Sequence, residues 1–433
     1  METHWDVIVV GAGLAGLTAG ATAAGAGASV LVLDGHRPGG RATTDDVGGY
    51  RFNRGGHAFY NGAAGRGVLR RLGVSVRGER PILAGARGRR GDTVGEIGLG
   101  ACGIVRTSLL GWRDKATLLR ALAGMRRWRP DRLADRSAAA WFDELGLARG
   151  AREAAEVIAR TATYVADMST VSADLVAAQV RLALDHGVEY LNGGWATMVD
   201  GLAAARNRGA EIHTGTRVRL VAPDGGRVRV ARDGDEGTLL ARRVVLAAGP
   251  PAACAALLPD RPPAWEELGP PARAACLDMG FATPPDMTVL LGLDRPLYLI
   301  RHCPPADLAP RGGSVVHGLR YLRPDEDPSP DAARGELLEH ARVAGIDPDA
   351  ADEVRYLHRM SVVGALPVPG VGLAGRIDVG DTGHDGVLVA GDWVGPRGHL
   401  ADASLASGED AGRLAAAGLH ADPVVHPVMR RAG

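Results

Sequence analysis

The sequence has very few lysines and cysteines, and it has no excess of charge of either sign. Lys115 is the only lysine among the 433 residues, so a mechanism that needs a buried lysine has a single candidate. The four cysteines are scattered, without a C-x-x-C pair or metal-ligand spacing. This argues against disulfides and a metal site and favours a reducing cytoplasm. Basic and acidic residues balance at 50 each, which argues against a nucleic-acid partner.

Long apolar segments are also scarce. The N-terminus lacks a positively charged region and a cleavage site, so we expect no secretory signal. Residues 7–33 carry no charge, but their apolar content is mostly glycine and alanine. A strand, a glycine turn, a helix of small residues and a second strand explain this segment better than a membrane span does.

The length and the 46% of hydrophobic residues fit two domains with a sizeable core. Residues 7–10 and 29–33 read as strands around a helix at 14–26. Apolar periodicity and turn residues predict further elements along the chain. We expect helices at 114–128, 137–147, 151–160, 171–186 and 400–417, and strands near 211–221, 227–231, 244–248, 288–293, 314–321 and 386–390.

A glycine fingerprint, GAGLAG at residues 11–16, follows the first predicted strand and opens the first helix. Gly11 permits a tight turn, Gly13 lets backbone approach a pyrophosphate, and Gly16 lets helix and strand pack closely. Asp34 stands at the end of the next strand, where a carboxylate accepts hydrogen bonds from ribose hydroxyls. The alternative is a helix hairpin with a solvated aspartate, and the context favours a dinucleotide site.

Two later motifs favour FAD over NAD. Gly39-Gly40-Arg41 can place a guanidinium over the pyrophosphate, although a surface turn is the alternative interpretation. Near the other end of the chain, Gly391-Asp392 follows a strand, and residues 401–408 open a helix. Asp392 can hold a ribityl hydroxyl, and the helix N-terminus can stabilise negative charge on a reduced flavin.

The motifs VVGAGLAG, LDGHRPGGRATT, FNRGGHAFY, LNGGWATMVDGLA, VVLAAGP and AGDWVGPRGHLADASLASGEDAGR resemble the phytoene desaturase branch of the flavin-containing amine oxidase superfamily, with protoporphyrinogen oxidase a close neighbour. The resemblance implies an α/β fold: a glutathione-reductase-type Rossmann FAD-binding domain with an inserted α+β substrate domain. The expected boundaries are 1–78, 190–258 and 372–433 for the FAD-binding domain, and 79–189 and 259–371 for the substrate domain.

The same resemblance assigns cofactor contacts by position. Residues around 11–41 would hold the adenine dinucleotide, residues 55–57 would lie near the isoalloxazine, and Val218 would contact adenine. Residues 391–403 would hold the ribityl group and the pyrimidine end of the flavin. The expected cofactor-binding residues are Gly11, Gly13, Ala15, Gly16, Asp34, Gly40, Arg41, Gly55, Gly56, His57, Val218, Gly249, Gly391, Asp392, Leu400, Ala401 and Ala403.

Two departures from the amine oxidases bear on the substrate. Those enzymes commonly use a lysine that orders water at the flavin and an aromatic pair beside the substrate amine. Lys115 falls in an arginine-rich helical segment, and the C-terminal aromatic position falls near the aliphatic Leu400. Oxidation of a simple amine is therefore disfavoured.

Four residues are candidate catalytic groups. His57 follows the loop expected at the flavin and could accept a proton, or it could simply hydrogen-bond backbone. His317 and Tyr321 share one face of a predicted strand and could line the substrate cavity, although ordinary sheet-surface residues are the commoner case. His399 precedes the C-terminal helix, where we expect Asp402 to cap the helix rather than to take protons.

Residues 112–136 combine many arginines with Trp112 and Trp128. This pattern fits an amphipathic helix that makes peripheral membrane contact, and it also fits a solvated charged face. The leading functional hypothesis is FAD-dependent dehydrogenation or desaturation of a lipophilic terpenoid or specialised metabolite by hydride transfer to flavin N5. The alternatives are amine oxidation with oxygen as acceptor, and a redox-neutral flavin-dependent isomerisation or cyclisation.

Overall fold

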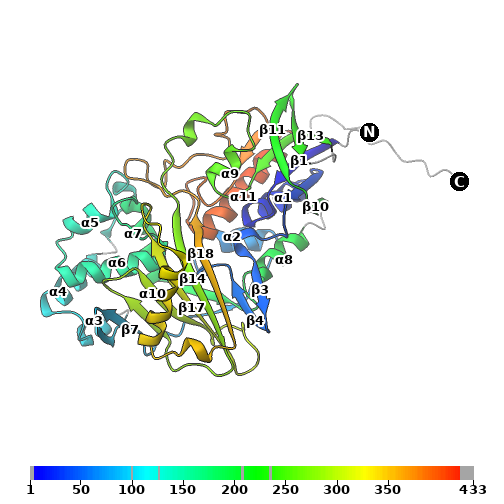
Figure 1. The fold of residues 1–433 in the computed structure, drawn as a ribbon. Coiled ribbons are helices and arrows are strands. Elements are labelled where there is room, and N and C mark those ends of the chain that lie inside the picture. The colour runs from blue at the N-terminus through cyan, green and yellow to red at the C-terminus, as the bar shows by residue number, and fades with distance from the viewer. Residues whose placement is uncertain (1–3, 99–100, 125–126, 206–208, 234–236, 420–433) are drawn as a thin grey trace.

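A computed structural model describes residues 4–98, 101–124, 127–205, 209–233 and 237–419. Two seven-stranded sheets organise this part of the chain. Figure 1 shows the first sheet beside helices from both ends of the sequence, and the second sheet between these and a group of helices from the middle of the chain.

The first sheet has the strand order β10-β2-β1-β13-β12-β11, and β19 pairs with β13. Its strands β10, β2, β1, β13 and β19 run parallel, whereas β11 and β12 are antiparallel additions. The strands are β1 (His4–Val10), β2 (Val30–Asp34), β10 (Ala210–Thr214), β11 (Val218–Asp224), β12 (Arg227–Arg232), β13 (Thr238–Leu246) and β19 (Val387–Val389).

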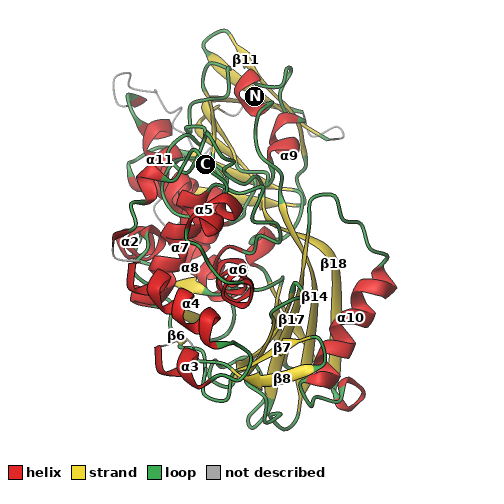
Figure 2. Cartoon of the chain, turned by 90° about the vertical axis from the view of Figure 1, so that its left-hand side faces the viewer, coloured by secondary structure: helices red, strands yellow, loops and turns green. Residues whose placement is uncertain are grey.

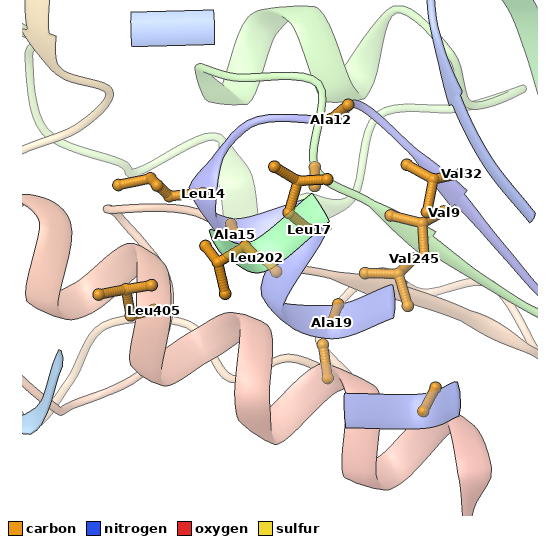
Figure 3. Packing of buried hydrophobic residues seen from close by; sticks show 14 of the residues in the cluster. Val9, Ala12, Leu14, Ala15, Leu17, Ala19, Val32, Leu202, Val245 and Leu405 are labelled. Atoms are coloured by element: carbon orange, nitrogen blue, oxygen red, sulfur yellow. The ribbon is translucent and has the colours of Figure 1, made fainter. Parts of the chain in front are cut away.

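The parallel strands are apolar on both faces because helices or loops cover both. Helix α1 (Leu14–Gly25) packs one face, and α11 (Leu400–Ala416) lies against α1. Figure 3 shows Val9, Val32 and Val245 from the strands beside Leu17 of α1, with Leu405 of α11 nearby. The two helices approach closely, since a Cβ on Gly408 would lie 2.4 Å from the carbonyl oxygen of Ala15.

The second sheet has the order β18-β14-β17-β16-β15-β7-β8. Helix α10 (Pro330–Val343) covers one of its faces, and Figure 2 shows α6 on the opposite side. Its strands are β7 (Arg87–Arg90), β8 (Thr93–Glu96), β14 (Ala272–Phe281), β15 (Val289–Gly292), β16 (Leu297–Cys303), β17 (Ser314–Leu322) and β18 (Glu353–Val363).

The remaining elements connect the two sheets. The helices are α2 (Ala64–Arg71), α3 (Ala101–Arg106), α4 (Trp112–Gly124), α5 (Ala138–Glu144), α6 (Arg149–Thr163), α7 (Ala173–His186), α8 (Ala196–Ala204) and α9 (Pro251–Ala255). Short strands form two small sheets: β3 (Thr44–Val47) with β4 (Tyr50–Asn53), and β5 (Phe59–Tyr60), β9 (Val188–Leu191) and β6 (Gly78–Glu79).

The α/β fold class is confirmed, with corrections to individual elements. Strands β14 and β18 are absent from the sequence-based prediction, because they lack a clean apolar–polar alternation and β18 contains a register shift against β14. Helix α4 ends at Gly124, so Trp128 lies beyond it and packs edge-on against Trp141 at 4.7 Å between ring centroids. Residues 125 and 126 of the 112–136 segment lie outside the described ranges.

The expected strand–turn–helix–strand at residues 7–33 is present as β1, α1 and β2. Within the ranges that the structure describes, no helix has both the length and the apolar character that crossing a bilayer requires. The domain boundaries stay a prediction.

Candidate functional site

A cleft of about 1070 Å³ opens at the carboxyl ends of β1, β2, β13 and β19. Ligands of parallel α/β sheets bind at this edge. The cleft continues to β18 and to the C-terminal end of α6. Small-molecule sites commonly occupy about 300–1,000 Å³, so this cleft is large enough for a dinucleotide.

The glycine fingerprint forms the turn between β1 and α1. Gly11 has a φ of 108°, and a Cβ on it would lie 2.3 Å from the carbonyl oxygen of Ala247. A Cβ on Gly16 would lie 1.8 Å from the carbonyl oxygen of Gly11. Gly13 differs from both, because a Cβ there would meet no heavy atom within 4 Å. Gly11 and Gly16 therefore permit the backbone packing, and Gly13 keeps the helix N-terminus open to the cleft.

Asp34 ends β2 and is fixed by two backbone amides. Its Oδ2 accepts from the N–H of Ala12 at 2.7 Å, and its Oδ1 accepts from the N–H of His36 at 2.8 Å. A carboxylate has further lone pairs beyond these two bonds. Asp34 lines the cleft and can accept hydrogen bonds from ribose hydroxyls there.

Arg41 and Asp392 form a bidentate ion pair across the cleft wall, with both N–O distances at 2.8 Å. The backbone N–H of Gly364 also donates to Asp392 at 3.0 Å. Burial alone would raise the pKa of Asp392, but the Arg41 guanidinium outweighs burial and lowers it. The expectation from sequence was a separate ligand contact for each residue, whereas the structure pairs them and leaves this wall without net charge.

Gly55, Gly56 and His57 lie at the other end of the cleft. The Nδ1 of His57 lies 2.7 Å from the carbonyl oxygen of Gly55, and since a carbonyl only accepts, Nδ1 carries the proton. The ring packs edge-on against Trp195, with 4.5 Å between centroids. Burial lowers the pKa of His57 to about 4, so its imidazole is neutral at pH 7.

The start of α11 reaches the same end through Leu400 and Ala401, whereas Ala403 is fully buried behind them. Asp402 does not cap α11, contrary to the expectation from sequence. Its Oδ1 accepts from the N–H of Gly65 at 2.8 Å, at the N-terminus of α2. Burial raises the pKa of Asp402 to about 7.

The other candidate catalytic residues lie outside the cleft. His399 bonds through Nε2 to the carbonyl oxygen of Thr163 at 3.0 Å. His317 bonds through Nδ1 to Asp278 at 2.6 Å, and Asp278 in turn accepts from Arg355 at 2.7 Å. Tyr321 is buried with its hydroxyl enclosed. These three side chains belong to the packed interior behind the cleft.

The remaining predicted cofactor residues line the cleft, except Gly16, which faces the turn, and the buried Ala403. Sequence reasoning missed Tyr164, Trp195 and Met360, which also line it. Trp195 belongs to the LNGGWATMVDGLA motif, so that motif was a sequence signal that could have identified it. Tyr164 and Met360 carry no such signal, because the packing of α6 and β18 alone brings them to the cleft.

The cleft thus offers an open helix N-terminus, an acceptor carboxylate at the end of β2 and, at its far end, a neutral histidine beside apolar side chains. This donor set fits a dinucleotide with a flat ring system at one end. Lys115, the single lysine, lies on α4, and its Nζ donates to the carbonyl oxygen of Val105 at 2.8 Å. The cleft therefore contains no lysine.

Comparisons with known proteins agree with this geometry. A family model described as flavin-containing amine oxidoreductase matches residues 14–414. The chain is similar to cyclohexylamine oxidase from Brevibacterium oxydans IH-35A, with a TM-score of 0.72 and 18% identity over 95% of this chain and 98% of that one. It is also similar to a protoporphyrinogen oxidase-like protein from Exiguobacterium sp. 255-15, with a TM-score of 0.68 and 17% identity over 96% of this chain and 98% of that one.

A shorter match links the chain to one of the subunits of limonene dehydrogenase from Castellaniella defragrans. The two are 52% identical over 56 residues, which cover 13% of this chain and 10% of that protein. The structural matches show a shared fold, and this short match shows local similarity in sequence.

Proposed function

We propose that this chain, which belongs to the family of flavin-containing amine oxidoreductases, dehydrogenates or desaturates a neutral, lipophilic organic substrate of the terpenoid or specialised-metabolite kind. It is an FAD-dependent oxidoreductase. When bound, FAD supplies an isoalloxazine whose N5 accepts a hydride. The open helix N-terminus at Gly13 and the carboxylate of Asp34 would hold its adenine half, and residues 55–57 and 400–401 would surround its ring system.

The observation that carries the proposal is the lack of a free carboxylate at the far end of the cleft, among the residues that the structure describes. His57 is uncharged at pH 7, and Arg41 and Asp392 neutralise each other. The half-exposed Arg54 lies 3.7 Å from Asp45, which also forms ion pairs with Arg37 and Arg355. Among the described lining residues at this end, no carboxylate is free to pair with an ammonium group. Because burying an unpaired charge is costly, the site disfavours a cationic amine, and we infer a neutral substrate.

The chain's own residues would position the substrate and exclude water. Tyr164, Met360 and Leu400 provide an apolar enclosure that holds the reacting C–H bond in place. Dehydrogenation also releases a proton from the substrate. Since Nδ1 of His57 carries the proton of the neutral ring, Nε2 has the lone pair, and we assign proton acceptance to it. The low pKa of His57 makes it a weak base that passes the proton on readily.

Anaerobic mixing tests the reaction class. A panel of neutral cyclic alkenes that includes limonene should bleach the oxidised flavin bands, and the product should be two hydrogens lighter by mass spectrometry. Peroxide release from an amine panel, with no bleaching by any neutral alkene, would overturn the proposal in favour of amine oxidation. Turnover to a product of unchanged mass would favour a redox-neutral isomerase or cyclase.

A lipophilic substrate would partition into membranes, so we extend the proposal to a peripheral membrane contact through α4. Trp112 is 75% exposed at the start of α4, and Val105 is 55% exposed on the adjacent α3. Arg113 lies over the Trp112 ring at 5.3 Å. Trp128 is partly buried against Trp141, so we do not include it as a second anchor.

Flotation with phosphatidylcholine vesicles, with and without phosphatidylserine, tests this contact. Trp112→Ala should reduce binding to the anionic vesicles, whereas Leu184→Ala, at an exposed apolar position on α7, should not. Absence of flotation for the wild type would contradict the contact.

A further inference from the structure

Tyr164 has an unusual backbone at the end of α6. Its φ and ψ are 61° and 18°, in the left-handed region, and its N–H donates to the carbonyl oxygen of Arg160 at 2.7 Å. Glycine is the usual residue at such a helix end, because a side chain in this conformation costs about 1–2 kcal/mol. A large aromatic residue here sacrifices stability, and strain of this kind is concentrated at functional sites.

The strained backbone places the phenol ring directly on the loop expected at the flavin. A Cβ on Gly56 would lie 2.7 Å from Cε1 of Tyr164 and 3.2 Å from its hydroxyl oxygen. Tyr164 is buried overall, yet it lines the cleft. Its ring therefore forms part of the wall at the reactive end.

The hydroxyl of Tyr164 is the unusual polar atom of this wall. Buried tyrosine hydroxyls normally find a partner, as Tyr60 does with the carbonyl oxygen of Ala162 at 2.8 Å. Among the residues that the structure describes, the hydroxyl of Tyr164 makes no hydrogen bond, and unlike that of Tyr321 it is not enclosed by protein. Burial raises the pKa of Tyr164 well above its ordinary value, so the hydroxyl stays protonated and can donate.

Apolar side chains share this end of the cleft with the phenol of Tyr164. Leu400 lines the same end of the cleft and also has a positive φ, of 54°. Met360 reaches the cleft where the register of β18 against β14 shifts, directly after Arg359 with its φ of 51°. Tyr164 and Leu400, both with a positive φ, thus border the same end of the cleft, where the hydroxyl of Tyr164 is a hydrogen-bond donor without a partner among the described residues.

We propose that Tyr164 is a substrate-positioning residue, whose hydroxyl donates a hydrogen bond to an oxygen atom on an otherwise apolar, neutral substrate. This inference rests on the proposed function and narrows its substrate class to oxygenated lipophilic molecules, such as ketones and alcohols. The hydrogen bond fixes which carbon of the substrate faces the flavin end. The apolar wall adds affinity for the substrate but does not fix its orientation.

Carvone and limonene are a matched pair of probes, because they share one carbon skeleton and differ mainly in a carbonyl group. Their binding to the FAD-loaded protein can be titrated through the change in flavin absorbance. The wild type should bind carvone more tightly than limonene, although limonene is the more hydrophobic. Equal affinity, or tighter binding of limonene, would overturn the inference.

Tyr164→Phe keeps the ring and removes the donor. One neutral hydrogen bond contributes about 0.5–1.5 kcal/mol, so the Kd for carvone should rise about two- to tenfold while that for limonene stays within about twofold. Tyr356→Phe, a phenol change on β18 outside the cleft, should alter neither value. The flavin spectrum of each variant checks that the site is intact.

Failure of the positioning role and failure of the proposed function give different results. If Tyr164→Phe changes both affinities equally or changes neither, the positioning role is wrong and the proposed function stands. If the wild type binds neither neutral probe but binds cyclohexylamine, the proposed function fails and the inference fails with it.

Discussion

Gly13 and Gly16 occupy one turn, yet a methyl group should have opposite consequences at the two positions. A Cβ on Gly16 would lie 1.8 Å from the carbonyl oxygen of Gly11, whereas a Cβ on Gly13 would meet no heavy atom within 4 Å. We therefore predict that Gly16→Ala destabilises the fold and that Gly13→Ala spares the fold but weakens FAD binding.

The structure sets the size of each effect. Ordinary contact begins at 3.4 Å, so relieving the clash at Gly16 requires a displacement of 3.4 minus 1.8, or 1.6 Å, between two backbone segments. Overpacking costs about 1–3 kcal/mol and sometimes more, and a backbone obstacle places Gly16→Ala at or above the upper end. Gly13 has a φ of −76° and a ψ of −177°, which alanine adopts without strain. Gly13 is the N-cap of α1, where alanine is less favourable than glycine, and this offsets the gain from a stiffer unfolded chain, so Gly13→Ala should change stability by no more than about 1 kcal/mol.

The methyl group of Gly13→Ala would stand in the space through which phosphates approach the N-terminus of α1. We expect FAD affinity to fall by at least about tenfold, which corresponds to about 1.4 kcal/mol. Thermal unfolding of the deflavinated proteins measures the first effect, and titration with FAD measures the second. Wild-type FAD affinity in Gly13→Ala, or wild-type stability in Gly16→Ala, would refute the reasoning.

Three further predictions concern charge and protonation. Arg41→Met leaves the carboxylate of Asp392 without its bidentate partner and should lower the free energy of unfolding by about 2–4 kcal/mol. This is less than for a fully buried pair, because the Arg41 side chain is 34% exposed. Urea unfolding measures the loss, with the exposed Arg51→Met as control. Burial lowers the pKa of His399 to about 4, so unfolded chains take up a proton that folded chains do not, and stability is lost as the pH falls from about 6.5 toward 4. His399→Asn should gain stability relative to the wild type across that window, and a difference that does not vary with pH would count against it. Burial raises the pKa of Asp402 to about 7, so the sign reverses and stability is lost as the pH rises from about 4 to 7; Asp402→Asn should become progressively more stable than the wild type over this range in the same urea series.

Much of the cofactor half of the site could be predicted from sequence, because local chemistry determines it. The fingerprint glycines, Asp34 and the start of α11 each follow from residues that are adjacent in the chain. The substrate half could not be predicted in this way. His317 and Tyr321 are candidates because of their alternation on β17, but that face packs against tyrosines and Asp278 rather than opening into the cleft.

The same distinction explains the errors in side-chain roles. Arg41 and Asp392 are 351 positions apart, so their ion pair has no local signature. Capping is a local rule and therefore assigns Asp402 to its own helix, whereas in the structure it binds the N-terminus of α2.

The sequence alone identified the glycine turn and Asp34 as a candidate dinucleotide site and limited a lysine-based mechanism to Lys115, since a local motif and a residue count need no tertiary contacts. Only the tertiary structure decided the chemistry at the reactive end. It paired Arg41 with Asp392, buried His57 until its imidazole became neutral, and brought Tyr164 and Met360 together with Leu400. Charge and pKa depend on what surrounds a group, and those neighbours come from segments that meet only when the chain folds.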